Sequence, residues 1–327
     1  MTHLPARPPR AGAPVAFDPT LAERLEHHAR VSRGALASNT ERALKADVAI
    51  FTAWCADQGL AALPATADTV AAFVDAMAAA KKPATVRRYV SSVITFHKAA
   101  GLASPTQALE VRMALKRMTR ERGTRQDQAA PLTRGVLDRL LAAGIPGDRL
   151  IDRRDRALLA VAYDTLVRRS ELVALTVEDL ATAEDGTGTV LVRKSKTDQA
   201  GEGMVRFLAA DTVPLVRAWL EAADIAAGPI FRPVSKAGAV GAAALAAGKV
   251  ARIVKERARR AGVDPAGLSG HSTRVGAAQD MIGAGLEIGE VMQAGGWKSP
   301  AMVARYSERL LARRGGAAKL AARQGRG

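Results

Sequence analysis

Apolar residues recur at helical spacing through residues 40–121, and a proline or glycine stands at almost every point where that spacing breaks. Pro83 and Pro105 occupy first-turn positions, while Gly59, Gly101 and Gly123 follow the ends of periodic runs. The pattern predicts helices over residues 40–58, 66–80, 83–99 and 105–121. These segments are expected to pack into one compact helical domain.

The character of the chain changes after that domain. Residues 119–128 are charged and lack an apolar period, which is typical of an interdomain linker. Segments 189–193 and 204–208 flank a polar loop rich in lysine and glycine, and this predicts an antiparallel hairpin. Around the hairpin, helices are predicted over 133–142, 149–163, 211–223, 242–261, 273–284 and 287–294.

The predicted fold class is therefore mainly α, with a small antiparallel β-sheet in the second of two domains. Residues 1–19 contain five prolines, and we expect a flexible arm that extends to residue 35. The predicted order is the arm 1–35, a helical domain 36–122, a linker 123–131 and a larger domain 132–327.

Positive charge is distributed along the whole chain. There are 48 Lys and Arg residues against 32 Asp and Glu, a formal net charge of +16. Residues 1–128 hold 18 basic and 11 acidic side chains, and residues 129–327 hold 30 and 21. The excess is not a detachable tail, and it favours a polyanion held by both parts. On charge alone, an arginine-rich composition explains it equally well.

Two classes of protein are excluded by composition. The single cysteine, Cys55, rules out an intramolecular disulfide framework and a thiolate zinc site, and it fits a reducing cytosol. No apolar stretch approaches the ~20 residues that span a bilayer, and residues 1–20 lack the apolar core of a signal peptide. We expect a soluble, intracellular protein without a membrane partner.

Two groups of polar residues are candidates for chemistry: one precedes the predicted hairpin, and the other lies within it. Arg168 and Glu171 are three residues apart and would share a helical face, although a surface ion pair is the simpler reading. Lys196 lies at the hairpin tip, where a long amine can reach into a groove, whereas most such lysines are merely solvated.

The segment 269–274 places a second pair at a predicted helix start. His271 and Arg274 are also three residues apart, and Gly270 and Ser272 leave the backbone room there. An imidazole and a guanidinium can then converge on one oxygen, and a helix amino terminus favours anions. Farther along, Trp297 follows two glycines and Tyr306 comes nine residues later; each is equally compatible with a packing role.

Taken together, these side chains match one chemistry. Phosphoryl transfer to a tyrosine hydroxyl without a metal requires cations at the non-bridging oxygens, a proton acceptor and a proton donor. The sequence offers that set in the order Arg168, Lys196, His271, Arg274, Trp297 and Tyr306.

Residues 268–281, LSGHSTRVGAAQDM, and 292–297, MQAGGW, closely resemble the tyrosine recombinases, particularly the Cre recombinase subgroup. Residues 162–168, AYDTLVR, resemble the same subgroup. The resemblance covers about residues 36–322. It implies that Arg168, His271 and Arg274 are catalytic and Glu171 supports Arg168. It also implies that Lys196 is a general acid, Trp297 the late His/Trp position and Tyr306 the nucleophile. Arg169 and Lys194 are adjacent rivals for the first arginine and the lysine.

The resemblance also implies a two-domain, C-shaped clamp around double-stranded DNA. In the helical domain it places Arg42, Lys45, Thr85, Arg87 and Arg88 toward the DNA, and in the second domain Arg232, Lys236, Lys249 and Arg252. Singly, each of these has a phosphate contact or a solvated face as the simpler role. Residues 308–322 correspond to the segment that docks on a neighbouring protomer.

The implied function is site-specific DNA recombination through a 3′-phosphotyrosyl intermediate and a Holliday junction, with no metal, ATP or other cofactor. The expected partners are inverted-repeat DNA sites and copies of the chain itself: a monomer when free, a dimer on one site and a homotetramer on two duplexes. The expected location is the cytoplasm, with the protein nucleoid-associated and encoded by a bacterium, phage or plasmid.

Two alternatives stay within DNA chemistry, and a third belongs to another class of protein. A phage or transposon integrase, or a chromosome-dimer resolvase, would share the catalytic residues and need accessory partners. A type IB topoisomerase would act as a monomer, but the close resemblance of the sequence around His271 to the Cre subgroup argues against it. A catalytically silent DNA-binding regulator would use the same scaffold.

Overall fold

The computed structural model describes residues 19–143, 149–195, 198 and 201–326. It divides between Asp127 and Gln128 into two compact units, and this point falls inside the segment 123–131 expected as a linker. The described elements are helices and one three-stranded antiparallel sheet, so the predicted fold class is confirmed. None of the described helices is long and apolar enough to cross a membrane.

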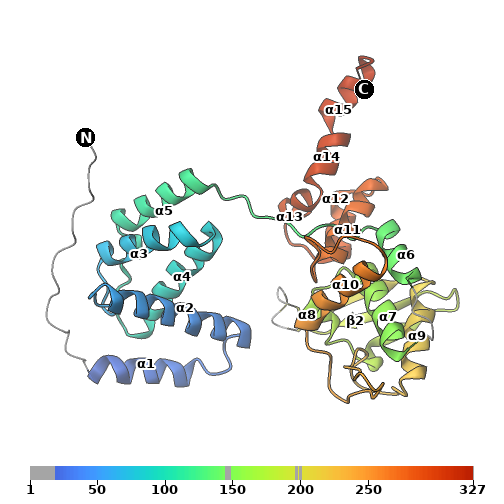
Figure 1. Ribbon diagram of the computed structural model, residues 1–327, viewed down its shortest axis with the longest axis horizontal. Coiled ribbons are helices and arrows are strands. Elements are labelled where there is room, and N and C mark those ends of the chain that lie inside the picture. Colours follow the sequence, from blue (N-terminus) through green and yellow to red (C-terminus); the bar gives the residue numbers. More distant parts are fainter. Residues whose placement is uncertain (1–18, 144–148, 196–197, 199–200, 327) are drawn as a thin grey trace. The chain divides into compact units, whose positions relative to one another are not determined.

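The first unit is entirely helical in its described part (Figure 1). Its elements are α1 (Pro19–Val31), α2 (Ser38–Asp57), α3 (Ala67–Ala80), α4 (Pro83–Ala99), the 3-10 turn η1 (Pro105–Gln107) and α5 (Leu109–Arg122). Thr66 caps α3 by accepting a hydrogen bond from the Thr69 amide at 3.1 Å. The four predicted helices are therefore confirmed, except that 105–107 forms η1 and α2 begins two residues before Thr40.

The expectation of an irregular arm over residues 1–35 is wrong for residues 19–31. Leu21, Leu25 and Ala29 are spaced four residues apart, so they give α1 one apolar face despite the prolines before it. The guanidinium of Arg24 donates to the Ala100 carbonyl at 3.3 Å and ties α1 to the end of α4. Residues 1–18 lie outside the described part of the chain.

Aromatic rings form the centre of the first unit. Phe51 of α2 and Phe73 of α3 are fully buried, with their ring centroids 5.0 Å apart in an edge-to-face arrangement. Trp54 contacts Phe73 from the other side at 5.3 Å, and Tyr89 of α4 closes the cluster at 6.0 Å. This packing fixes α4, which carries three of the residues expected to face DNA.

The second unit surrounds a short sheet with helices. Its helices are α6 (Arg134–Ala142), α7 (Leu150–Thr165), α8 (Arg169–Leu172), η2 (Val177–Asp179), α9 (Thr212–Ala222), α10 (Gly248–Arg260), α11 (Ser272–Gly283), α12 (Ile288–Gly295), α13 (Pro300–Tyr306), α14 (Glu308–Arg314) and α15 (Gly316–Arg323). Its strands are β1 (Leu180–Thr182), β2 (Gly188–Val192) and β3 (Met204–Leu208), in the order β1-β2-β3.

The β2–β3 hairpin is confirmed, and β1 is an addition that its three-residue length made invisible. The predicted helix 242–261 is wrong over 242–247. There the main chain pairs with the preceding loop instead, since the Gly241 amide donates to the Pro233 carbonyl and the Leu245 amide to the Phe231 carbonyl. Burial of Leu245 at 4% exposure fixes that loop against the core.

Helix α7 is the central buried helix of the second unit. It packs against α9, α11 and strand β3, and its residues Ala157, Leu158 and Leu159 are fully buried. A second, smaller cluster joins Leu166 at the end of α7 to residues of α11, α12 and α13. Helices α14 and α15 continue from α13 away from the rest of this unit (Figure 1). The smaller cluster contains Trp297, and Tyr306 packs against it.

Candidate active site

Arg168 and Glu171 lie at the turn that follows α7. Leu166 adopts a left-handed conformation with φ of 51° and ends α7, after which Arg168 is extended and caps α8. Nη1 of Arg168 donates to Glu171 Oε1 at 2.8 Å, and the Arg168 amide donates to Oε2 at 2.8 Å. Glu171 is 7% exposed. The carboxylate therefore holds both the main chain and the guanidinium of Arg168 in place.

Arg274 is buried in the first turn of α11. It is 2% exposed; its Nη1 donates to the Leu166 carbonyl and its Nη2 to the Gly295 carbonyl at 2.8 Å. These bonds join the end of α7 to the end of α12. Burial, followed by the nearby charge of Arg168, lowers the pKa of Arg274 to about 10. The guanidinium is still a cation at neutral pH.

His271 caps the same helix three residues earlier. Desolvation of its ring lowers its pKa, and the cationic side chains of Arg274, Arg169 and Arg168 lower it further. The imidazole is thus favoured in its neutral form, which can accept a proton. Helix α11 approaches Leu132 so closely that a Cβ on Gly276 would lie 1.9 Å from the Leu132 carbonyl oxygen, which fixes the start of this helix.

Trp297 and Tyr306 contact each other beside Arg274. The Arg274 guanidinium carbon lies 4.2 Å from the centroid of the Trp297 ring, a cation–π contact. The Trp297 and Tyr306 ring centroids are 5.7 Å apart. A Cβ on Gly295 would lie 2.0 Å from Trp297 Cζ3, so only glycine leaves room for this indole. The structure thus brings Arg274, Trp297 and Tyr306 into one contact chain.

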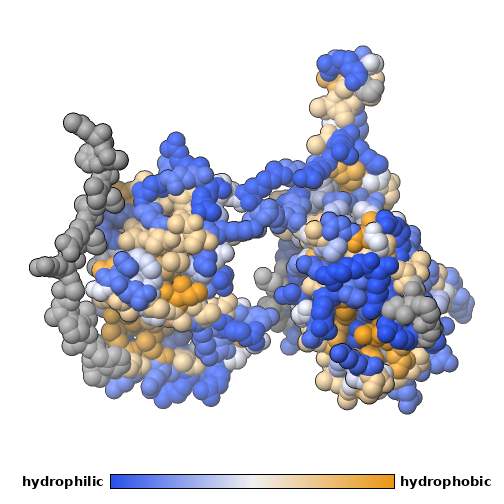
Figure 2. All heavy atoms as spheres, in the orientation of Figure 1, coloured by the Kyte–Doolittle hydropathy of each residue, from blue (hydrophilic) through white to orange (hydrophobic). Residues whose placement is uncertain are grey.

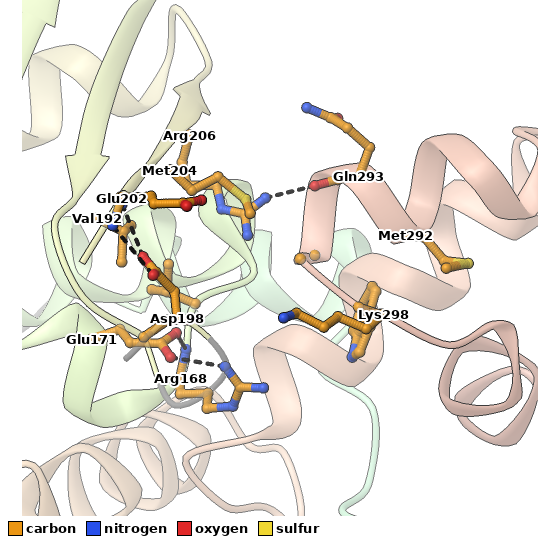
Figure 3. A pocket seen from close by; sticks show the side chains of 16 residues that line it. Arg168, Glu171, Val192, Asp198, Glu202, Met204, Arg206, Met292, Gln293 and Lys298 are labelled. Carbon is orange, nitrogen blue, oxygen red and sulfur yellow. Dashed lines mark hydrogen bonds and ion pairs between the residues drawn. The ribbon is translucent and has the colours of Figure 1, made fainter. Parts of the chain in front are cut away.

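Arg168 and Trp297 also line a cavity of about 560 Å³ (Figure 3). Sequence reasoning missed two of its basic residues, Arg206 and Lys298. Lys298 directly follows Trp297, and its amine points into the cavity (Figure 3). Arg206 lies on β3 between Val205 and Phe207. Lys298 could have been identified from the sequence because it directly follows Trp297. No comparable signal marked Arg206.

The hairpin tip borders the same cavity. Lys196, the predicted general acid, lies outside the described residues. Asp198 accepts hydrogen bonds from the amides of Gly201, Glu202 and Gly203 at 2.9, 3.2 and 2.9 Å and thereby folds the end of the loop. The rival Lys194 is exposed, and its stem lies against Gly201.

The basic residues expected to face DNA in the first unit are exposed, and each forms an ion pair or hydrogen bond within that unit. Arg88 forms an ion pair at 3.0 Å with Asp47, which is 1% exposed, and Arg87 donates to the Thr119 hydroxyl at 2.7 Å. Thr85 is half-buried near them at the start of α4. On α2, Arg42 bonds to the Asn39 side chain and Lys45 pairs with Glu41.

In the second unit, the predicted DNA-facing residues differ in whether their side chains bond to the main chain. Arg232 donates to the carbonyls of Pro229 and Ala227 and so braces its own loop. Lys236 is exposed in that loop, and Lys249 and Arg252 are exposed on α10. Figure 2 shows a hydrophilic surface over α10.

Comparison with known proteins places these features in a sequence family. The sequence profile of the phage integrase family matches residues 130–312. An integrase/recombinase xerD homolog of Selenomonas ruminantium is 33% identical over 301 residues, covering 87% of this chain and 88% of the relative. The recombinase cre of Escherichia phage P1 is 28% identical over 297 residues, covering 85% and 86%.

Solved structures share the fold at lower identity. The integrase of transposon Tn1549, in complex with transposon right end DNA, has a TM-score of 0.62 and 15% identity, covering 88% of this chain and 94% of that one. A lambda integrase dimer bound to a COC′ core site has a TM-score of 0.57 and 17% identity, covering 88% and 76%.

Proposed function

The chain belongs to the phage integrase family and is a site-specific recombinase of the tyrosine type, and we propose that Tyr306 is the nucleophile with which it cuts and rejoins double-stranded DNA. The observation that carries this assignment is the contact chain from the buried Arg274 through the Trp297 ring to the Tyr306 ring. It places an aromatic hydroxyl in the same cluster as a fixed guanidinium.

The proposed reaction is a transfer of the scissile phosphate to Tyr306. The tyrosine oxygen attacks phosphorus, a bond forms between them, and the hydroxyl proton passes to the neutral imidazole of His271. The bond to the 5′ oxygen breaks, and that oxygen takes a proton from Lys196. Arg168 and Arg274 stabilise the negative charge on the non-bridging oxygens. Rejoining reverses these steps, so the bond energy stays in the phosphotyrosyl link and no ATP is used.

A nicked suicide substrate tests the nucleophile. A short strand diffuses away after cleavage, so the covalent protein–DNA adduct accumulates and is counted on a denaturing gel. We expect the parent chain to form the adduct and Tyr306→Phe to form none. An equal yield from Tyr306→Phe would show that the nucleophile is another residue. Absence of adduct from the parent chain on its own selected site would favour a silent DNA-binding regulator.

The general acid has its own test. Lys196→Ala should slow cleavage of ordinary DNA strongly and cleavage of a 5′-bridging phosphorothiolate much less, because a sulfur leaving group does not need the proton. Lys194→Ala is the matched control and should affect both substrates little. Equal slowing of both substrates by Lys196→Ala would remove Lys196 from this role.

We further propose that both units grip the duplex, with Arg42, Lys45, Thr85, Arg87 and Arg88 from one and Arg232, Lys236, Lys249 and Arg252 from the other. The net positive charge of both parts, +7 for residues 1–128 and +9 for residues 129–327, supports this proposal. Each phosphate contact contributes about −0.9 to the slope of log K against log salt. A binding titration from 50 to 300 mM salt should therefore give a steep line, and removing two of these cations should flatten it.

Recombination is proposed to take place in a homotetramer on two duplexes, through a Holliday junction. Helices α14 and α15 have no buried residue, and Leu320 is 54% exposed, which supports their docking on a neighbouring protomer. Deleting residues 308–327 should preserve adduct formation on a half-site and abolish recombination between two full sites.

Autonomous, Cre-like action is proposed over an integrase or chromosome-dimer resolvase that needs accessory proteins. The similarity to cre spans most of both chains. Bound fragments selected from genomic or plasmid DNA should contain an inverted repeat. The purified chain alone should then recombine two copies of it; recombination only with host extract would favour the integrase or resolvase.

A further inference from the structure

Arg206 is a buried cation on β3, where it shares the inner face of the strand with the core residue Leu208. It is 8% exposed, whereas its neighbours Val205 and Phe207 are 58% and 57% exposed. The register pairs Arg206 with Val190 of β2, and this sets its side chain on the inner face. Leu208, two residues farther along, is 2% exposed on the same face. A guanidinium therefore occupies an inward position next to an apolar core residue.

The guanidinium binds the carboxyl end of α12. Nη1 of Arg206 donates to the Gln293 carbonyl at 2.7 Å and to the Ala294 carbonyl (Figure 3). The last carbonyls of a helix have no partner within the helix, and they carry its partial negative charge. Arg274 holds the next carbonyl, that of Gly295, at 2.8 Å. Three successive carbonyls just before Trp297 are therefore fixed by two arginines.

The turn that follows is shaped around the same guanidinium. Gly296 has φ of 62°, in the left-handed region, and a Cβ there would lie 2.4 Å from Nη2 of Arg206. With Gly295 making room for the indole, the turn has Arg206 on one side and the Trp297 ring on the other. Displacement of Arg206 would release the main chain that sets this ring.

The burial of Arg206 is costly, which argues against an incidental role. Its Nε is buried without a hydrogen-bond partner among the described residues. Burial also lowers its pKa, and neither of its two carbonyl partners carries a full negative charge. An apolar residue at this position would avoid both costs.

We propose that Arg206 is a positioning residue for cleavage, which sets the Trp297 ring against Arg274 and Tyr306 and joins the β2–β3 hairpin to that turn. The proposal rests on the proposed function, since it assumes that Tyr306 attacks DNA. Arg206 also joins two parts of the site: the β2–β3 hairpin and the turn that contains Trp297 are held by one side chain.

The first test separates cleavage from binding. Arg206→Ala should lower the single-turnover rate of adduct formation on the suicide substrate about 100-fold, the cost of a small misplacement of reacting groups. Its Kd for intact DNA should stay within about 3-fold of the parent. Arg217→Ala, an exposed arginine on α9, is the matched control and should cleave at the parent rate.

Chemical rescue distinguishes positioning from general stability. Methylguanidinium can refill the space left in Arg206→Ala, and it should recover at least 10-fold of the lost rate without raising the rate of the control. Arg206→Lys should remain slow, because one ammonium cannot replace the planar fork. A rate for Arg206→Ala within 3-fold of the parent, or a loss of rate matched by an equal loss of DNA affinity, would overturn the proposal.

The single variant Gly296→Ala covers the case in which Arg206→Ala does not fold, and a double-mutant cycle applies when both fold. Gly296→Ala pushes against the guanidinium and leaves β3 intact, so it should slow cleavage about 30-fold or more in the folded protein. If Arg206→Ala folds, adding Gly296→Ala to it should cost much less. Full activity of folded Gly296→Ala would refute the proposal, as would strictly additive losses. Tyr306→Phe, run in parallel, shows separately whether the proposed function holds.

Discussion

The side-chain amide of Gln279 donates a hydrogen bond of 2.8 Å to the main-chain carbonyl of Tyr306. Gln279 lies on α11, the helix that also carries Arg274, and Tyr306 is the last residue of α13. The bond therefore links the proposed nucleophile to the helix that contains the buried arginine, at a carbonyl that the end of α13 leaves free.

Replacing Gln279 by leucine should slow adduct formation about 10-fold and leave DNA affinity unchanged. Leucine keeps the volume but cannot donate, so the end of α13 becomes free to shift by a fraction of an ångström. Single-turnover cleavage of a suicide substrate measures the effect, with the exposed Gln58→Leu as control. A Gln279→Leu chain that cleaves as fast as Gln58→Leu would show that α13 is held by other contacts.

A second glutamine, the first residue of the second unit, contacts the preceding carbonyl. Nε2 of Gln128 donates to the Arg305 carbonyl at 2.6 Å. Gln128→Ala should reduce cleavage several-fold, and its effect should be larger in the Gln279→Leu background, because the two amides hold adjacent carbonyls of one turn. The cycle is measured with the same suicide substrate. Simple multiplication of the two separate effects would mean that the two bonds act independently.

The residues that resemble the family were accessible from sequence because their spacing is local. His271 and Arg274 occupy one helical turn, and Trp297 follows a glycine pair that only close packing explains. Chemistry and spacing together identified a set of which Arg274, Trp297 and Tyr306 are found in contact. Their roles remain a proposal.

Arg206 could not be predicted for the opposite reason. Its hydrogen bonds reach carbonyls 87 and 88 residues away, and β3 has apolar residues on both faces, so its local pattern does not indicate which face is buried. Helix α1 was missed because the prolines before it outweighed a short apolar face. Arg206 thus depends on contacts distant in the sequence, whereas α1 follows from its own apolar spacing.

The pH dependence of cleavage should reflect the lowered pKa of His271. Because the imidazole must be neutral to accept a proton, the acid limb of the cleavage rate should lie below the ordinary histidine value of 6.5. Arg169 is one of the cations that lower this pKa, so Arg169→Gln should move the limb toward higher pH. Single-turnover rates from pH 5 to 8 test this, with Arg193→Gln as control. A limb that does not move would mean that another group accepts the proton.

The stability of the first unit should fall in mild acid because of His97. Its ring is fully buried; Nδ1 contacts the Val93 carbonyl at 2.9 Å and Nε2 accepts the Ala65 amide at 3.0 Å, so the neutral form is required. Burial lowers its pKa below the ordinary 6.5, so the unfolded chain takes up the proton first. The stabilisation is complete above pH 6.5 and is lost as the pH falls below that value.

Cys55 offers a local measurement, because this single thiol is buried in the core of the same unit. The urea concentration at which pulse labelling reaches Cys55 should be lower at pH 5.0 than at pH 7.5 in the parent. His97→Gln can still accept the Ala65 amide but does not titrate, and it should show a smaller difference between the two pH values. An undiminished difference would assign the effect to other groups.

A buried ionic cluster should dominate the stability of the second unit. Asp152 Oδ1 accepts from Arg257 Nη1 at 3.1 Å and from Arg260 Nη1 at 2.9 Å, and Arg257, which is fully buried, also donates to the Leu140 carbonyl at 2.5 Å. Asp152→Ala leaves the Arg257 charge buried without a carboxylate at this distance. The free energy of unfolding should fall by about 3–5 kcal/mol.

Replacing both Asp152 and Arg257 separates two effects on the free energy of unfolding: the net contribution of the ion pair, and the penalty of leaving one buried charge without its partner. Asp152→Leu combined with Arg257→Met removes both charges from the interior, and it should restore much of the stability that Asp152→Ala loses, because no desolvated charge remains at either position. Urea unfolding followed by fluorescence measures all variants, with the solvent-exposed Lys45→Ala as a control that should not change the midpoint. A double variant as unstable as Asp152→Ala would mean that the ion pair stabilises the unit beyond its burial cost, which would make it more than a tolerated charge.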